Sequence, residues 1–178
     1  MKLISLSFLI LTGVVARAIE PGLHPDIEYG QAGGVSLKLD VSVPEGAGPF
    51  PVAILVHGGG WGSGDKANVG VVGGGADVSP WFWPHTDAKF TWFSINYRLA
   101  PAHRWPAQIE DVQAAIRWVK AHAAEYKGDP KRIALFGHSA GGHLSMLAGM
   151  IAESDTRVQA LVGYAPVTDF EYELPVRQ

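Results

Sequence analysis

Residues 52–56 are apolar at every position, and this short run restricts how the chain can fold more than any other feature. A strand with one face in water alternates apolar and polar residues, whereas an unbroken apolar run is typical of a strand buried on both faces. Residues 132–136 and 158–164 are two further apolar strand candidates, and residues 90–97 are another. Several such strands predict a sheet that is covered on both sides.

Helical patterns alternate with these strands. Residues 106–126 and 140–151 carry apolar side chains at helical spacing. Residues 35–43 alternate strictly and predict a strand with one wet face. Residues 21–34 are rich in Pro and Gly and predict a loose lead-in, with at most a short edge strand at 27–29. The alternation of strands and helices predicts a three-layer α/β/α sandwich with a mostly parallel sheet.

The composition is that of one ordinary globular domain. The chain has 178 residues, of which 47% are hydrophobic, so it can bury a sizeable core. The formal net charge is −3 and no basic run occurs, which argues against nucleic acid or an anionic membrane surface as a partner. There is no cysteine, so disulfides, thiolate catalysis and cysteine-ligated metals are excluded. The seven histidines are scattered, and we expect neither a metal nor a cofactor.

The first eighteen residues have the pattern of a signal peptide. Lys2 supplies a positive start, residues 3–15 are almost wholly apolar, and Ala16 and Ala18 are small residues at the positions that a signal peptidase tests. The apolar run is short for a bilayer span. We therefore expect cleavage after Ala18, export to the periplasm or the extracellular space, no stable membrane span afterwards, and a domain at residues 19–178. A buried first element or a membrane anchor is the alternative interpretation.

Residues 137–141 read Gly-His-Ser-Ala-Gly and fit the pattern Gly-x-Ser-x-Gly between a predicted strand and a predicted helix. A sharp strand-to-helix turn holds its serine in strained geometry above the sheet, and the two glycines remove side chains that would collide there. The amide of Ala140 and the helix N-terminus then point toward a developing oxyanion. Ser139 is therefore the candidate nucleophile. A glycine-rich helix start with a capping serine is the simpler alternative.

Residues 57–60 read His-Gly-Gly-Gly and directly follow the buried strand at 52–56. Three glycines let the main chain approach a ligand closely and turn its N–H groups inward. A phosphate-binding loop is excluded, because no Gly-Lys-Ser or Gly-Lys-Thr follows and no helix opens at once. The loop is thus a candidate source of oxyanion donors, with an ordinary glycine turn as the alternative.

Three segments together carry a resemblance to a known family: residues 57–61 (His-Gly-Gly-Gly-Trp), 96–101 (Asn-Tyr-Arg-Leu-Ala-Pro) and 137–143 (Gly-His-Ser-Ala-Gly-Gly-His). The chain resembles the hormone-sensitive-lipase-type esterases and the related BD-FAE-like esterase/lipase branch of the α/β-hydrolases, over about residues 35–169. The resemblance implies the α/β-hydrolase fold. It also implies hydrolysis of a small carboxylic ester through an acyl-enzyme.

The resemblance also implies a role for each matching position. Ser139 would attack the ester carbonyl. The amides of Gly59, Gly60 and Ala140 would form the oxyanion hole. His57 would hold the glycine loop through hydrogen bonds and would not be the base.

A serine nucleophile needs a base, and the base needs an orienting acid. In α/β-hydrolases both follow the serine in the chain, the acid first. After Ser139 the only histidine is His143, about one turn along the predicted helix, where it is a poor candidate for the base. Asp155 and Asp169 come too early in the family's pattern to be the acid. We interpret the chain as an incomplete copy of an esterase, truncated at the C-terminus and inactive by itself.

Other interpretations stay open at this point. The chain could be a natural inactive remnant that binds a small acyl or aromatic ligand, or its missing half could come from another chain. Within the enzymes, a prolyl-oligopeptidase-like peptidase is the runner-up, because it shares the fold and the serine turn.

The remaining candidates have weaker signals. An aromatic group could line a substrate pocket or could pack the core, and its members are Trp61, Trp81, Phe82, Trp83 and Trp92. Structural roles are expected for His138 in a pocket wall, for Asp65 and Lys66 beside the glycine loop, and for Asp111 and the corner at 96–98. Surface or loop positions are expected for the other histidines, His24, His85, His103 and His122.

Overall fold

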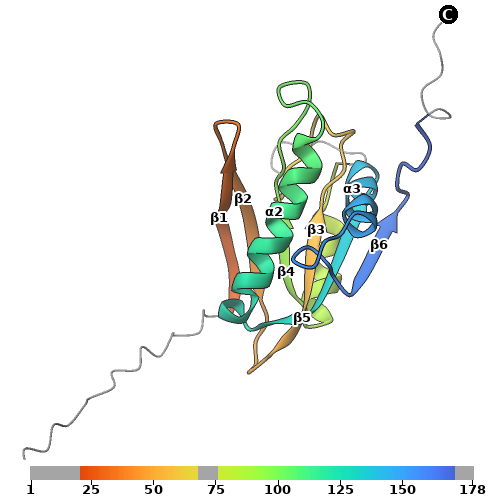
Figure 1. Cartoon of the computed structure of the whole chain (residues 1–178). Coiled ribbons are helices and arrows are strands. Elements are labelled where there is room, and N and C mark those ends of the chain that lie inside the picture. The colour runs from red at the N-terminus through yellow and green to blue at the C-terminus, as the bar shows by residue number, and fades with distance from the viewer. Residues whose placement is uncertain (1–20, 68–75, 171–178) are drawn as a thin grey trace, which may run out of the picture.

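The computed structural model describes residues 21–67 and 76–170. At their centre is a six-stranded sheet in the order β1-β2-β4-β3-β5-β6 (Figure 1). The strands are β1 (Gly22–Ala32), β2 (Val35–Val43), β3 (Phe50–Val56), β4 (Thr91–Ile95), β5 (Gly128–His138) and β6 (Ala160–Tyr164). The helices are α1 (Phe82–Asp87), α2 (Ala107–His122) and α3 (Ala140–Met150), with short 3-10 turns η1 (Ser79–Trp81) and η2 (Ala123–Tyr126). Pairing is antiparallel between β1, β2 and β4 and parallel from β4 to β6.

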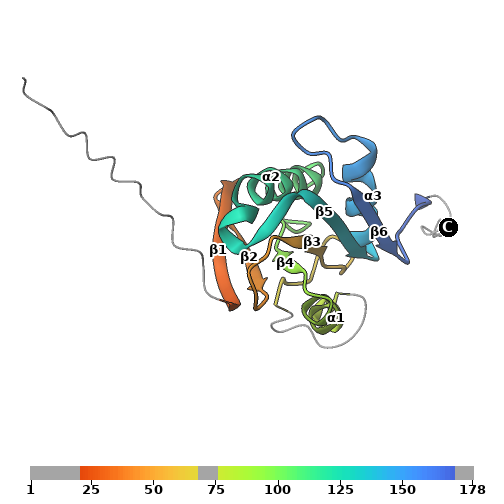
Figure 2. The ribbon, with the colours of Figure 1, turned by 90° about the horizontal axis from the view of Figure 1, so that it is seen from below.

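Helices cover both faces of the sheet, so the predicted three-layer arrangement is confirmed. Figure 2 shows α2 and α3 on one side and α1 on the other. The run at 52–56 explains why both covers are needed. Its first, third and fifth residues join the large core with α2 and α3, and its second and fourth join a smaller aromatic core beside α1. Every residue of the run is at most 1% exposed.

The first strand is longer than its sequence suggests. Residues 22–32 form one strand of 11 residues that pairs with β2, so the expected loose lead-in is wrong. The pairing shifts register between His24 and Ile27 and again between Glu28 and Gly30. Bulges of this kind accommodate Pro and Gly in an edge strand. They also break the alternation by which a strand is recognised in the sequence.

The predicted wet face of β2 is dry over half its length. Ser36 and Lys38 are exposed as expected, but Asp40 is 3% exposed and Ser42 is 9% exposed. The reason is a long-range contact, because Lys66 from the segment after β3 lies directly on Asp40. The strand itself and its apolar face are as predicted.

The two main helices follow the predicted pattern closely. The segment at 106–126 is α2 continued by the 3-10 turn η2, and Ile109, Val112, Ile116 and Val119 all lie in the large core. The sequence shows no clear pattern over residues 62–89, and the structure has η1 and α1 at the end of this segment. Within the described residues, no helix is long and apolar enough to cross a membrane.

Within the described residues, β6 is the other edge strand of the sheet, and it carries exposed apolar side chains. Along β6 the side chains alternate between exposed and half-buried, with Val162 40% and Tyr164 65% exposed. Met150 at the end of α3 is 80% exposed. The opposite edge strand, β1, exposes Asp26, Glu28 and Gln31, but it also exposes the apolar Leu23, at 59%.

Candidate active site

The sheet order brings two distant motifs together. After β3 the chain crosses to β4 on one side, and after β5 it crosses to β6 on the other side. The carboxyl ends of β3 and β5 therefore flank a topological switch point, where ligands bind in open α/β sheets. The glycine loop at 57–60 follows β3 and Ser139 follows β5. Val56 pairs directly with Gly137, so the loop and the serine emerge side by side.

Ser139 occupies the sharp turn between β5 and α3. Its backbone angles are φ 53° and ψ −120°, a region that costs a non-glycine residue about 1–3 kcal/mol. Its N–H donates to the Tyr164 carbonyl at 3.0 Å, and its carbonyl accepts from the His143 N–H at 2.9 Å. The strain is thus held by bonds to β6 and to the first turn of α3. This is the geometry that the Gly-x-Ser-x-Gly pattern predicts.

Both flanking glycines are required by space. A Cβ atom at Gly137 would overlap the Gly141 carbonyl. A Cβ at Gly141 would overlap the carbonyls of Val56 and His57 at the end of β3. The start of α3 therefore lies against the backbone of β3, and this contact places the serine next to the glycine loop.

His57 anchors the glycine loop from inside. Its ring is 1% exposed and stacks on Tyr97 with 4.3 Å between centroids. Its Nδ1 contacts the Gly58 carbonyl at 2.8 Å, and the Tyr97 hydroxyl donates to the His57 carbonyl at 3.0 Å. Burial lowers the pKa of His57, so the ring is neutral at pH 7. These contacts fit the loop-supporting role that the resemblance implies.

Gly59 and Gly60 turn back sharply, with φ of 101° and 58°. The Gly59 carbonyl accepts the N–H groups of Gly62 and Ser63 at 3.1 and 3.0 Å. Within the described part of the chain, none of the hydrogen bonds holding this turn uses the N–H of Gly59 or Gly60. Ala140, the third predicted donor, is the buried first residue of α3. The role of these three amides as oxyanion donors stays a prediction.

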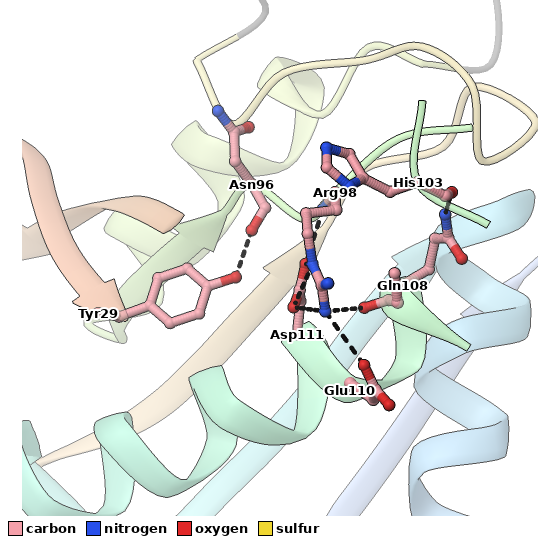
Figure 3. A network of polar contacts seen from close by, with 8 residues as sticks. Tyr29, Asn96, Arg98, His103, Gln108, Glu110 and Asp111 are labelled. Carbon is pink, nitrogen blue, oxygen red and sulfur yellow. Dashed lines mark hydrogen bonds and ion pairs between the residues drawn. The ribbon is translucent and has the colours of Figure 1, made fainter. Parts of the chain in front are cut away.

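The corner at 96–98 is structural, as expected. Figure 3 shows the Arg98 side chain lying between Asp111 and Glu110 on α2. Asp111 is 1% exposed and receives the Arg98 guanidinium at 2.8 Å and the Arg98 N–H at 2.8 Å. Tyr29, which lies in β1, donates a hydrogen bond from its hydroxyl to the Asn96 carbonyl. The corner therefore ties β4 to α2 and to β1.

The histidines near the serine are held among rings. His143 packs against Trp61, Trp105 and Phe170 at centroid distances of 5.4, 6.3 and 5.2 Å. The His138 ring lies 5.5 Å from that of Tyr164. Among the described residues, the buried Nδ1 of His143 has no hydrogen-bond partner, whereas the Nδ1 of a triad histidine is held by a carboxylate.

One surface assignment is wrong. His85 in α1 is only 8% exposed, because it is enclosed by the aromatic core beside that helix. Its Nδ1 contacts the Trp81 carbonyl at 2.6 Å. The sequence does carry a signal for the burial of His85, since aromatic residues lie close to it on both sides. His24, His103 and His122 are half-buried.

Asp155, one of the two carboxylates after the serine, is a poor triad acid in space as well. Asp155 forms an exposed ion pair with Arg117 at 2.6 Å. This bond lowers the pKa of Asp155. Asp169 is exposed on the segment after β6. Within the described residues, no group of three or more His, Asp or Glu side chains could hold a metal ion.

An apolar cavity of about 390 Å³ opens beside this site. Its lining comes from the residue after the glycine loop, from the corner, from α2 and α3, and from the segment after β6: Trp61, Ala100, Trp105, Gln108, His143 and Phe170. The aromatic group named from sequence therefore divides. Trp61 lines the cavity, Phe82 stacks on Trp92 in the core at 4.5 Å, and Trp83 is 73% exposed. Trp105, Gln108 and Phe170 carry no sequence signal that marks them as cavity residues.

Comparison with known proteins settles the family. The BD-FAE family model matches residues 39–174, most of the chain. The chain belongs to the BD-FAE family. Its relatives and structural neighbours are esterases, and the α/β-hydrolase fold inferred from the motifs is confirmed.

Two relatives of this BD-FAE chain come from Mycobacterium tuberculosis. The probable carboxylic ester hydrolase LipM is 38% identical over 157 residues, which are 80% of this chain and 33% of that protein. Esterase LipC is 42% identical over 69% of this chain and 31% of its own length. Among solved structures, Thermogutta terrifontis esterase 2 with propionate bound is 27% identical with a TM-score of 0.69, covering 89% of this chain and 59% of that one. The chain spans about a third of the length of these curated relatives.

Proposed function

We propose that this chain supplies the nucleophile and the oxyanion hole of a serine carboxylesterase. The observation that carries the proposal is the strained Ser139 at the switch point, directly beside the glycine loop. The names of the relatives support ester hydrolysis as the reaction. The apolar cavity next to Trp61 is the candidate pocket for one end of a small ester.

The proposed reaction has two halves. Ser139 Oγ attacks the ester carbonyl carbon while its proton passes to a histidine base, and the amides of Gly59, Gly60 and Ala140 stabilise the oxyanion. The bond to the alcohol oxygen then breaks, and the alcohol leaves with that proton. Water hydrolyses the acyl-serine, which releases the carboxylic acid and restores the serine hydroxyl.

We further propose that the triad acid and base lie in polypeptide outside these 178 residues. Two findings support this proposal. The chain spans about a third of the length of its curated relatives. In addition, the described rings of His57 and His143 have other contacts, the first within the glycine loop and the second among aromatic side chains.

The test is covalent labelling of the complete enzyme, meaning the chain together with the polypeptide that completes it. A fluorophosphonate probe should label Ser139, and Ser139→Ala should abolish both labelling and turnover of nitrophenyl butyrate. Ser154→Ala is the control, because Ser154 is exposed on the segment after α3. The 178-residue chain alone should be roughly a thousandfold or more slower, since it keeps only the oxyanion and binding contributions. Equal labelling of the parent and of Ser139→Ala would refute the nucleophile assignment.

A peptidase or an inactive binding protein is less well supported. Oxyanion donors from a glycine loop after an early strand are the esterase arrangement, and the relatives reported above are esterases. Cleavage of a proline-linked peptide without turnover of a short nitrophenyl ester would favour the peptidase. Ligand binding without any labelling in the complete enzyme would favour the inactive protein.

We also propose that the protein is exported with cleavage after Ala18. The support is the sequence of residues 1–18, which lie outside the described part of the chain. Mass spectrometry of the secreted or periplasmic protein should find residue 19 at the N-terminus.

A further inference from the structure

The segment that follows the glycine loop is held by a buried lysine. Lys66 is 6% exposed, and its ammonium lies 2.6 Å from Asp40 and 3.1 Å from Asp26. Asp40 itself is only 3% exposed on β2, whereas the Asp26 side chain is 63% exposed. Burial lowers the pKa of Lys66, but the hydrogen bonds with the two carboxylates outweigh this effect and raise its pKa. The lysine is therefore charged, and Asp40 and Lys66 form an ion pair inside the protein.

The backbone of Lys66 is fixed as firmly as its side chain. Its N–H donates to the Asn96 side-chain oxygen at 2.6 Å, and its carbonyl accepts from the Ser94 hydroxyl at 2.6 Å. The Asn96 amide nitrogen in turn donates to Asp65 at 3.0 Å. This segment is thus attached to β2 through the ion pair, to β4 through Ser94, and to the residue directly after β4, Asn96.

From Lys66 the contacts continue back to the oxyanion glycines. Gly64 lies so close to the His57 ring that a Cβ there would overlap it. One step further, the turn at 59–63 is closed by bonds to the Gly59 carbonyl, including one from the Ser63 hydroxyl at 2.9 Å. A Cβ at Gly59 would overlap the backbone of Ser63. The glycine loop and the lysine therefore belong to one packed segment.

We propose that the Asp40–Lys66 ion pair positions the glycine loop and so sets where the amides of Gly59 and Gly60 point. The inference rests on the proposed function, because it takes these amides to be oxyanion donors. A buried ion pair adds little net stability but can fix one geometry among several. Oxyanion donors act on the transition state more than on the bound substrate. Misplacing them therefore lowers kcat and leaves KM nearly unchanged.

The kinetic test uses two carboxylates that contact the same lysine. In the complete enzyme, Asp40→Asn and Lys66→Met should each lower kcat for nitrophenyl butyrate by roughly tenfold, part of the 100- to 1,000-fold lost when one oxyanion donor is deleted. The KM should change less than about twofold. Asp26→Asn is the matched control and should leave both constants unchanged. The double variant of Asp40 and Lys66 should be no slower than the slower single variant, because the two side chains act as one pair.

Rates are divided by the number of sites that a fluorophosphonate titrates, so that loss of folded protein does not count as loss of kcat. A second readout needs no catalysis. Amide signals of Gly59 and Gly60 in protein labelled with ¹⁵N-glycine should shift in Asp40→Asn and stay in place in Asp26→Asn. An inactive parent enzyme would refute the proposed function alone, and the glycine signals would still test the positioning. Unchanged kcat per titrated site, or unchanged glycine signals in Asp40→Asn, would overturn the positioning.

Discussion

Adding a single methyl group at Gly141 tests whether the contact between α3 and β3 builds the serine turn. In Gly141→Ala the new Cβ would overlap the carbonyls of Val56 and His57. These are backbone atoms of a central strand and its loop, so they cannot rotate away as a side chain could. Overpacking a well-filled site costs about 1–3 kcal/mol even where side chains can adjust. Against this, alanine in a helix gains about 1 kcal/mol over glycine. Because backbone atoms cannot adjust, the upper end of that range, about 3 kcal/mol, applies, and we expect a net loss of about 2 kcal/mol, or roughly 4–8 °C in Tm for a chain of this size.

Gly142→Ala is the matched control in the next position of the same helix. It gains the same helical propensity, and its Cβ would meet the Gly137 carbonyl and Pro166 at 3.1 Å, a tight contact that a small shift relieves. We expect a change in stability within about 1 kcal/mol of zero. Urea unfolding followed by circular dichroism gives both values. If Gly141→Ala unfolds at the same urea concentration as Gly142→Ala, the close contact between α3 and the end of β3 is not what fixes this turn.

Three further predictions concern the rest of the fold. Asp111→Ala removes the buried partner of a guanidinium and should cost about 3–5 kcal/mol in urea unfolding, whereas Glu110→Gln, at the exposed partner of the same group, should cost under about 1 kcal/mol. Burial lowers the pKa of His85 below its usual 6.5, so below pH 6.5 the unfolded state binds more protons than the folded state. The free energy of unfolding should therefore fall from pH 7 to pH 5, and His85→Phe should weaken this pH dependence. In the 178 residues expressed by themselves, the exposed apolar side chains at β6 should cause self-association, and Val162→Lys should raise the monomer fraction in size-exclusion chromatography more than Leu23→Lys on the opposite edge strand. Equal effects of the two lysine variants would show that the β6 edge is not the associating surface.

The parts of the fold that sequence predicts are those set by neighbouring residues. The apolar run at 52–56 identifies a doubly covered strand because each of its residues needs an apolar neighbour on one face or the other. The turn at Ser139 is recognisable for a similar reason. Its glycines are forced by contacts, and no other residue fits beside the carbonyls that they touch. A local steric requirement leaves a readable pattern.

Features set by strand register or distant packing leave no such pattern. Asp40 alternates with apolar residues as an exposed aspartate would, but its carboxylate is buried beside Lys66 and accepts the Asp26 N–H, and both partners are distant in the sequence. The bulges in β1 interrupt the alternation of side chains, so this strand of 11 residues, which contains Pro and Gly, is not recognised from the sequence. The cavity draws its walls from five separate segments, so that Trp105 and Phe170 cannot be assigned to it before the fold is known.

The same distinction explains why a motif search misses the proposed positioning pair but finds the two glycines proposed for the oxyanion hole. Gly59 and Gly60 must be glycine because of their own backbone angles, and this requirement stays inside the loop. The precision of their amides is a different requirement, since a loop with three glycines has many accessible shapes. Something outside the loop has to select one of them. In this chain we propose that one loop shape is selected by contacts of Lys66 with Asp40 in β2 and with Asn96 directly after β4. Asp40 and Asn96 are distant from the loop in the sequence, and the strand order of the sheet brings them close to it. In the proposed arrangement, the direction of the Gly59 and Gly60 amides thus depends on Asp40 in β2 and on Asn96 directly after β4, both of which lie outside the loop.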